Sequence, residues 1–268
     1  MTDDSTLSVP DSVVPTWVVR TLGLARREVL RVTRRAKNTV LPPIVTNGLY
    51  ITVFGVILGA RIGETQGVPY LQFVLPGLIA LGAISQSFQN AAFSLFHSRW
   101  EGYVEVMIAA PISSAEGIVS YLLGSAVRGL LVGGAVFALG YLFTGTPVRH
   151  PALLIAFVVV VVLLFGGLGL VGGMWADDFD QLTVFNQFLI RPLVFFGGVF
   201  YPLADLPGIA RTVSYLNPIV YIVNGIRFSL TGISSVPPLT SLAVLVGATV
   251  LVVGLDVWLF ERGFGLTE

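Results

Sequence analysis

Two arginines lie inside otherwise apolar segments, and they are the residues of this sequence that most need a functional explanation. Arg128 and Arg191 fall near the middle of predicted membrane-spanning helices, counting about 1.5 Å of rise per residue. A charge at that depth is costly and therefore indicates a function. Three interpretations stay open. The two side chains face a transport pathway and attract an anionic headgroup or phosphate, they pair internally with Asp256, or they snorkel toward an interface.

A second polar set interrupts the apolar stretch FYPLADLPGIARTVSYLNPIVYIVNGIRFSLTG, residues 200–232. Asn217-Pro218 predicts a break, because the residue before a proline is pushed out of helical conformation. Upstream we expect one short helix with Asp205 as its N-cap. Downstream we expect a second helix, with Pro218 in its first turn and Gly232 near its end. Two short apolar helices that meet at a break predict a re-entrant hairpin that lines something, since irregular backbone at membrane depth needs protein or a water-filled cavity around it.

The polar residues of this hairpin allow two interpretations. They cap its helices and stabilise its turns, or they gate the outer mouth of a pathway. The residues concerned are Pro207, Asn217, Pro218, Asn224 and Arg227.

Catalytic and metal-binding patterns are missing from the sequence. The only lysine, Lys37, follows Ala36, so there is no phosphate-binding G-x-x-x-x-G-K-[ST] loop, and there is no G-x-S-x-G elbow. His97 and His150 fall in different loops, and the acidic cluster at 177–180 is typical of a solvated turn. We therefore expect no catalytic residues, no metal and no cofactor on this chain. If ATP drives it, another chain must supply the ATPase.

The composition identifies the environment that positions these residues. Of 268 residues, 54% are hydrophobic and 11% are charged, whereas soluble domains are about a quarter charged. Net charge is zero, which argues against a nucleic-acid partner, and there is no cysteine. We predict an all-α integral membrane protein with six spans of roughly 20 residues. The predicted spans are Val40–Ala60, Tyr70–Phe96, Gly117–Phe143, Pro151–Trp175, Leu182–Phe200 and Leu239–Phe260.

The distribution of basic residues predicts the orientation of the chain. Seven basic residues precede the first span, which places the N-terminus in the cytoplasm. With six spans, the C-terminus is cytoplasmic too, and the hairpin lies on the outer side. The N-terminus lacks the pattern of a secretory signal, so we expect the first span to remain. The basic residues are Arg20, Arg26, Arg27, Arg31, Arg34, Arg35 and Lys37.

Three regions follow along the chain. We expect a disordered tail at 1–15, an amphipathic interfacial helix at 16–38 and a six-helix transmembrane domain at 39–268. In the amphipathic segment, apolar residues recur at helical spacing opposite the arginines. Such a helix lies among anionic headgroups as an anchor, or it also contacts a partner subunit. Glycines in GLGLVGG and VGGAVFALG predict close helix approach, and the phenylalanines at 185–200 favour packing over a substrate belt.

Three stretches resemble the permease subunits of ABC-2 type exporters. They are SRWEGYVEVMIAAPISSAEGIVSYLLG in the first inner loop, FFGGVFYPLADLP after span five, and YLNPIVYIVNGIRFSLTG in the hairpin. The first is similar to the family's pattern of a basic residue, a glycine and a short helix ending at a proline, here Arg99, Gly102 and Pro111. The second is similar to its Gly-Val-x-x-Pro, and the third to its Leu-Asn-Pro followed by Asn-x-x-Arg.

The resemblance implies a partner and a place of contact. Members of that family work as two identical or related six-helix subunits with two cytoplasmic ATPase subunits, which carry ATP and magnesium. The first inner loop acts as a coupling helix. Here an apolar row of Trp100, Val104 and Ile108 could pack on the spans or fill a groove of the partner. An acidic row of Glu101 and Glu105 could meet basic groups of the ATPase. A solvated helix without a partner is the alternative. The residues assigned to coupling are Arg99, Trp100, Glu101, Val104, Glu105 and Ile108.

The predicted function is therefore that of an export permease subunit in a prokaryotic plasma membrane, moving substrate from the cytoplasm or inner leaflet outward. Two alternatives remain: an ATP-independent transporter or channel, and a membrane scaffold whose hairpin serves assembly. The composition and the three motifs give no substrate.

Overall fold

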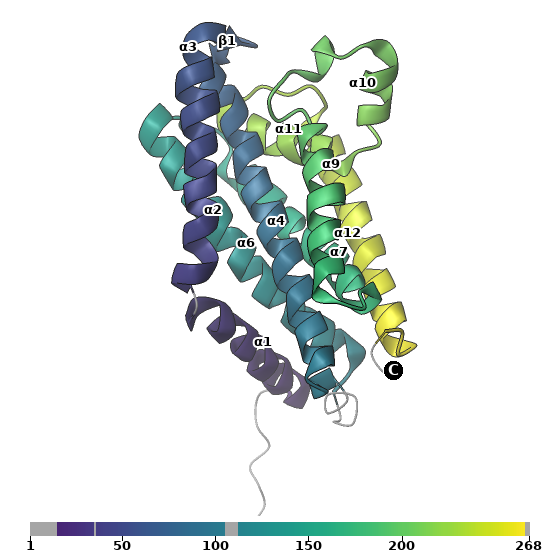
Figure 1. The fold of residues 1–268 in the computed structure, drawn as a ribbon. Helices are drawn as coiled ribbons and strands as arrows, with labels where there is room; N and C mark the ends of the chain where they lie inside the picture. Colours follow the sequence, from purple (N-terminus) through teal and green to yellow (C-terminus); the bar gives the residue numbers. More distant parts are fainter. Residues whose placement is uncertain (1–14, 35, 105–111, 266–268) are drawn as a thin grey trace, which may run out of the picture.

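The computed structural model describes residues 15–34, 36–104 and 112–265. The predicted tail, Glu105 and Ile108 lie largely or wholly outside these ranges. Helices dominate the described residues, which confirms the all-α expectation (Figure 1). The strands β1 (Glu64–Thr65) and β2 (Val68–Pro69) form one small antiparallel hairpin, with Thr65 opposite Val68. Its two-residue turn has positive φ at Gln66 and Gly67, as a tight hairpin requires.

The helical elements follow the order of the predicted segments. They are α1 (Thr16–Arg34), α2 (Ala36–Tyr50), the π-helical η1 (Ile51–Leu58), α3 (Gly59–Ile62), α4 (Tyr70–Trp100), α6 (Ser114–Thr144), α7 (Pro151–Trp175), α8 (Phe179–Val184), the π-helical η2 (Phe185–Ile190), α9 (Arg191–Phe195), the 3-10 turn η3 (Leu203–Asp205), α10 (Gly208–Ser214), α11 (Pro218–Thr231) and α12 (Pro238–Glu261).

Five of these helices, within the described residues, are long and apolar enough to cross a membrane. They correspond to predicted spans one to four and six. The fifth predicted span, 182–200, differs in its bounds. The consecutive segments α8, η2 and α9 cover 179–195, which is shorter than the five spans, and the helix ends at Phe195 rather than Phe200. Gly198, three residues later, adopts a left-handed conformation with φ of 72°, so the chain does not continue as a helix to Phe200. The five spans are 39–62, 70–100, 114–144, 151–175 and 238–261.

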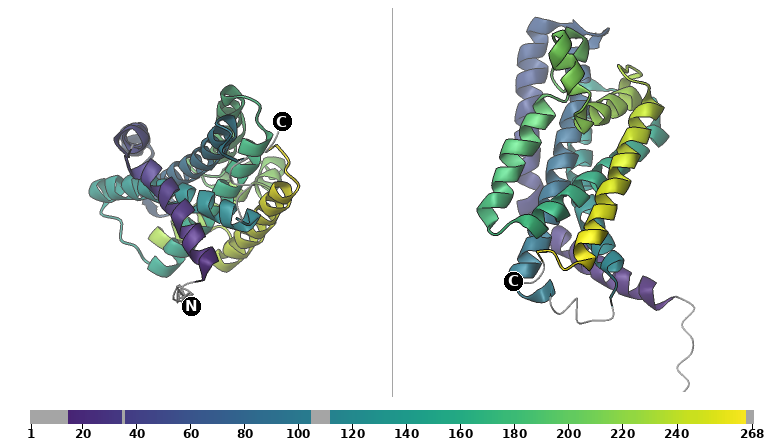
Figure 2. Two further views of the ribbon diagram at one scale, coloured as in Figure 1. Left: turned by 90° about the horizontal axis from the view of Figure 1, so that it is seen from below. Right: turned by 90° about the vertical axis from the view of Figure 1, so that its right-hand side faces the viewer.

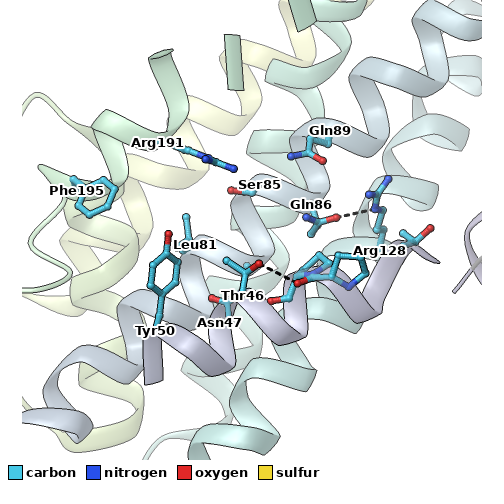
Figure 3. Close-up of a pocket in the computed structure, with 14 residues that line it drawn as sticks. Thr46, Asn47, Tyr50, Leu81, Ser85, Gln86, Gln89, Arg128, Arg191 and Phe195 are labelled. Atoms are coloured by element: carbon cyan, nitrogen blue, oxygen red, sulfur yellow. Dashed lines mark hydrogen bonds between the residues drawn. The ribbon is translucent and has the colours of Figure 1, made fainter. Parts of the chain in front are cut away.

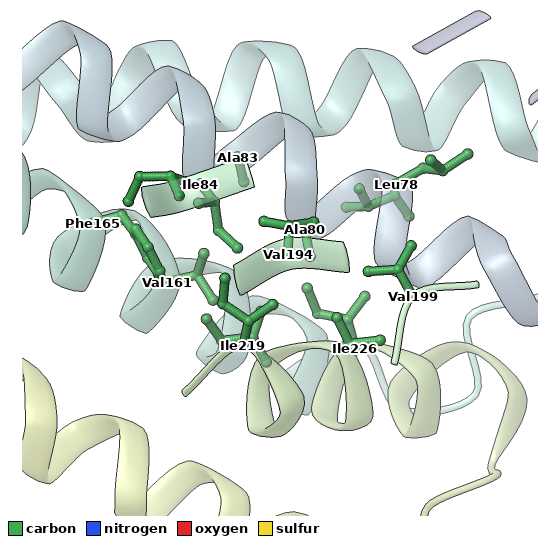
Figure 4. Close-up of a cluster of buried hydrophobic side chains, with 14 of the residues drawn as sticks. Leu78, Ala80, Ala83, Ile84, Val161, Phe165, Val194, Val199, Ile219 and Ile226 are labelled. Carbon is green, nitrogen blue, oxygen red and sulfur yellow. The ribbon is translucent and has the colours of Figure 1, made fainter. Parts of the chain in front are cut away.

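The helix α4 forms the centre of the bundle, with α6 and α7 packed along it (Figure 1). Figure 4 shows side chains from α4, α7, α9 and α11 meeting in one apolar cluster, among them Ile84, Phe165, Val194 and Ile219. Three glycines of GLGLVGG, at 169, 172 and 173, lie close to α4, whereas Gly167 faces α12. A Cβ at Gly173 would lie 2.7 Å from the carbonyl oxygen of Ala92. Small residues at such a face let helix backbones approach in a membrane.

The amphipathic helix α1 lies across one end of the bundle and docks on the start of α6 (Figures 1 and 2). Arg20 pairs with Glu116 at 3.4 Å. Glu116 also closes a capping box with Ser113, because each accepts the other's backbone N–H. Glu28 is buried, although it belongs to a basic helix, and accepts a 2.6 Å hydrogen bond from Ser94 of α4. These contacts fix α1 to α4 and α6.

The two ends of the bundle carry different segments of the chain. The β-hairpin, α10 and α11 gather at the end opposite α1 (Figure 1). The chain's last described residues return to the α1 end, where Gly265 contacts the carbonyl of Met174. The segments between predicted spans one and two and between five and six therefore share one end, and the last described residues share the other end with α1.

Candidate functional site

A polar pocket of about 300 Å³ lies where α2, α4, α6 and α9 meet. Figure 3 shows Arg191 and Arg128 on opposite sides of it, with Ser85, Gln86 and Gln89 of α4 between them in this view. The lining residues are Thr39, Pro42, Pro43, Thr46, Asn47, Tyr50, Leu81, Gly82, Ser85, Gln86, Gln89, Arg128, Arg191 and Phe195.

The α4 wall of this pocket was not anticipated from the sequence. Gly82, Ser85, Gln86 and Gln89 recur at spacings of three and four, which places them on one face of α4. Small and polar residues at helical period inside an apolar span were a usable signal. The signal is weak, because the span as a whole is apolar.

Arg128 and Arg191 both line this pocket. The Arg128 Nε donates a 2.9 Å hydrogen bond to the Gln86 side-chain oxygen. This partner is neutral, so the bond orients the guanidinium and leaves its charge uncompensated. Arg191 is exposed and begins α9. Convergence of two arginines on one pocket is the arrangement that the pathway interpretation requires.

Pairing with Asp256, the second interpretation of the arginines, does not occur in the structure. Asp256 is fully buried on α12 near Gly167, and within the described chain neither of its carboxyl oxygens has a hydrogen-bond partner. Arg128 instead uses Gln86. Similar depth in the membrane does not place two residues on facing sides of their helices.

Arg99, the basic residue of the first predicted motif, ties two helix ends together. It lies in the last turn of α4, and its Nη1 donates to the carbonyls of Gly173 (2.7 Å), Met174 (3.1 Å) and Ala176 (3.0 Å). The last carbonyls of a helix lack intrahelical donors and carry the negative end of its dipole. A guanidinium at this point satisfies them and locks the end of α7 to the end of α4.

The predicted coupling rows do not lie along one continuous helix. Trp100 ends α4, Glu101 is its C-cap, and Gly102 follows with φ of 68°. Val104 is fully buried and packs with α4, α6 and α7, so it seats on the spans. Trp100 is 71% exposed. The left-handed glycine turns the chain between them, which four-residue spacing alone does not reveal.

Glu101 of the predicted coupling segment lies near solvent, at the end of the bundle where the aspartates of 177–180 are also exposed. Glu101 lies 3.2 Å from the Nε2 of His97, and both side chains are about half exposed. The Trp100 ring contacts Phe96 and Phe179. Glu105 and Ile108 lie outside the described residues. Of the predicted coupling residues that are described, Trp100 and Glu101 therefore present side chains outward.

Arg227, the most deeply buried cation of the predicted hairpin, stabilises the fold. It is 5% exposed and donates to the carbonyls of Phe73 (3.2 Å) and Gly198 (2.8 Å). Its guanidinium stacks 3.8 Å from the centre of the Phe73 ring. These contacts join α11 to α4 and to the turn after α9.

The two asparagines of the hairpin act similarly. Asn217 caps α11 by accepting from Ile219 N (3.0 Å), and it donates to the Leu193 carbonyl (2.6 Å). Asn224 bridges to Ser241 of α12 and to the backbone at 235–236. Both are buried, so these bonds hold the hairpin against α9 and α12.

The helix boundaries of the hairpin agree partly with the sequence. The helix α11 begins at Pro218 and ends at Gly232, whose φ of 80° closes it, as predicted. The Asp205 cap is wrong: Asp205 belongs to η3, and α10 begins after Pro207 without a side-chain cap. Pro207 keeps the preceding Leu206 extended, with ψ of 142°, so the chain enters the helix two residues later than expected.

Comparisons with known proteins agree with this architecture. The family profile described as "ABC-2 type transporter" matches residues 20–231. The chain is 36% identical to the "Inner membrane transport permease YadH" of Escherichia coli K12 over 241 residues, covering 90% of this chain and 94% of that protein. It is 24% identical to a "Nodulation protein J" of Rhizobium leguminosarum bv. viciae over 225 residues, covering 82% and 86%.

Proposed function

Because the chain belongs to the ABC-2 type transporter family, as a multi-pass membrane permease, we propose that it is the transmembrane subunit of an ATP-driven exporter. A separate subunit binds ATP and magnesium and hydrolyses the nucleotide. The substrate moves from the cytoplasm or the inner leaflet outward. Both termini and α1 then face the cytoplasm of a prokaryotic cell, in keeping with the seven basic residues before the first span.

The observation that carries this proposal is the polar pocket between α2, α4, α6 and α9. A scaffold protein has no need of two arginines, two glutamines and an asparagine at one point between membrane helices. Such groups are costly in lipid and are retained where a polar substrate or water passes. The pocket therefore favours transport over a purely structural role.

Coupling to the ATPase follows from the contacts at the α1 end. A force on the segment that begins at Glu101 reaches α4 directly, and it reaches α7 through Arg99. Val104 transmits the same displacement to the apolar cluster beneath it. The exposed Trp100 and Glu101 are the groups that meet the ATPase, with Glu105 and Ile108 continuing that contact. Because Arg99 and Val104 connect this segment to α4, α6 and α7, these three spans would move together, as a gating motion needs.

The working unit is two copies of this chain with two ATPase subunits. Apolar side chains on both sides of the pocket face outward: Val45 and Leu49 on α2, and Phe188 and Phe196 beside α9. A second copy placed against these faces would cover them and close the pocket laterally. In this arrangement the phenylalanines pack at a subunit contact.

The helices α10 and α11 form the outer, re-entrant closure of the pathway. Asn217, Asn224 and Arg227 hold α11 rigidly to its neighbours. Movement at the outer mouth is therefore concentrated in α10, between Pro207 and the break at Asn217-Pro218.

Co-purification tests the proposal. A tagged chain, extracted from its native membrane in mild detergent, is expected to carry an ATP-binding subunit in equal amount, and ATP hydrolysis by that subunit is expected to change when the chain is removed. Flux through the purified chain alone, driven by an ion gradient, would support the ATP-independent alternative. A chain that binds no nucleotide-hydrolysing subunit and moves no solute would support the scaffold.

A further inference from the structure

A second, larger pocket of about 700 Å³ lies beneath α1, between that helix and the bundle. Its wall is unusually basic. Four of its arginines come from α1, one comes from α6, and a histidine comes from α4. These residues are Arg26, Arg27, Arg31, Arg34, Arg128 and His97.

The two pockets adjoin, because Thr39 and Arg128 line both of them. Arg128 therefore stands at their junction, and Arg191 lies beyond it in the first pocket. Together the pockets describe a path that starts under the interfacial helix and continues between the membrane helices.

The charge along this path is strongly one-sided. Among the described residues no aspartate or glutamate lines either pocket. Glu28 offsets Arg31 at 2.8 Å, and Arg27 stacks on Tyr103 without losing its charge. Arg128 has only neutral Gln86 as its hydrogen-bond partner. The path therefore presents a surplus of positive charge. Around the partly buried Arg128 the dielectric is reduced, which strengthens attraction for an anion.

The side chains in the pocket walls indicate the chemical class of the ligand. Guanidinium groups present planar pairs of donors that match phosphate oxygens. Beyond Arg128, the first pocket also has Tyr50, Leu81 and Phe195 in its wall. A free anion gains nothing from those apolar groups. A lipid-like molecule would keep its headgroup among the arginines and its chains beside α2 and α9.

We propose that the two pockets are an entry path for an amphiphile with a phosphate-bearing headgroup, taken from the leaflet in which α1 lies. The headgroup binds first at the arginines of α1, passes Arg128 and reaches Arg191. The assignment of a substrate class rests on the proposed export function. Binding of the amphiphile in the two pockets needs only this chain and can be tested without the ATPase.

Binding is tested on the purified full chain in neutral detergent by native mass spectrometry. The probes are phosphatidic acid, diacylglycerol with the same chains, and glycerol 3-phosphate with the same headgroup. Phosphatidic acid is expected to bind about tenfold or more tightly than either of the others. Equal binding of diacylglycerol would overturn the role of the phosphate, and equal binding of glycerol 3-phosphate would overturn the role of the chains.

Variants locate the binding. Arg128→Gln and Arg191→Gln are each expected to weaken phosphatidic acid binding about tenfold, the loss typical of one charge-assisted contact. Arg61→Gln, at an exposed arginine of α3 far from both pockets, is the matched control and is expected to bind normally. Arg191 is exposed, so its variant keeps the test valid if Arg128→Gln fails to fold. Unchanged binding by a folded Arg191→Gln protein would overturn the path.

A second readout separates this inference from the proposed function. In the complex with its ATPase, phosphatidic acid is expected to stimulate ATP hydrolysis severalfold over diacylglycerol, and Arg191→Gln to remove the stimulation. Binding without stimulation, in a complex that hydrolyses ATP, would show a membrane anchor and overturn the substrate path while leaving the exporter intact. Absence of any ATPase partner would overturn the exporter, and the binding comparison would still decide the path.

Discussion

Gly169→Ala is expected to destabilise the protein by about 2 kcal/mol, a typical cost of overpacking a close contact. The Cβ of the alanine would meet the backbone carbonyl oxygen of Phe88, and it would lie 3.0 Å from the Cβ of Ala91. A flexible side chain can move aside, whereas the backbone of the central helix cannot. Relief therefore requires α7 to move away from α4, which loosens the contact between these two helices. The free energy of unfolding can be measured by titration from mild detergent into SDS.

Gly134→Ala is the matched control, because it changes the same residue type in a neighbouring span. No heavy atom lies within 4 Å of the position of its added Cβ. Its unfolding free energy should stay level or rise by up to about 1 kcal/mol, since alanine is the better helix former. Equal stabilities of the two variants would contradict the close α4–α7 contact.

Arg99→Ala is expected to lower ATP-dependent transport roughly tenfold or more, the effect of removing a charged donor from buried carbonyl acceptors. The alanine leaves the carbonyls of Gly173, Met174 and Ala176 without their side-chain donor. The end of α7 then loses its hydrogen-bonded link to the last turn of α4, so movement of the inner loop is passed to α7 less effectively. ATP hydrolysis by the partner should persist, and the ratio of substrate moved to ATP consumed measures the loss.

Arg99→Lys retains the charge and one donor group, so it should recover part of the transport. Arg262→Ala, at an exposed arginine just after α12, is the matched control, because it removes the same group from a position where the guanidinium stacks on the nearby Trp258 ring at 4.1 Å. If Arg99→Ala transports as well per ATP as the Arg262→Ala protein, the link between α4 and α7 has no part in coupling.

Local signals in the sequence were sufficient for much of the fold. Long apolar runs located five spans to within a few residues, because hydropathy depends on composition alone. Pro218 and Gly232 located both ends of α11, since each residue restricts its own backbone. The glycine motif of α7 predicted close approach correctly.

Features that depend on rotation about a helix axis or on distant contacts were not accessible in this way. Similar depth in the membrane suggested Asp256 as an ion-pair partner of Arg128. Depth does not determine which way a helix face points, and the structure pairs Arg128 with Gln86 instead. Glu28 reads as one acid on a basic helix, and only the docking of α1 on α4 explains its burial. The left-handed Gly102 separates Trp100 from Val104, although their spacing suggests one row.

The pocket itself required the assembled structure. Its walls come from segments more than 100 residues apart, so no short motif contains them. The polar face of α4 was a local signal, but only the position of Arg191 on a different helix gives that face a partner across a cavity.

Access to this pocket is the most direct test of the central claim, that ATP used by a partner opens and closes a path through these helices. The chain contains no cysteine, so Ser85→Cys places a single thiol in the pocket wall. Without nucleotide, a membrane-impermeant thiol reagent should label it from the side of α1. Trapping the complex with ATP and vanadate should change the labelling rate by about tenfold or more, as a shift between two access states requires.

Ser234→Cys, exposed between α11 and α12, should react from the opposite side at a rate independent of nucleotide. If Ser85→Cys keeps the same labelling rate from the same side in both states, while the complex hydrolyses ATP, the pocket lies on no ATP-gated path.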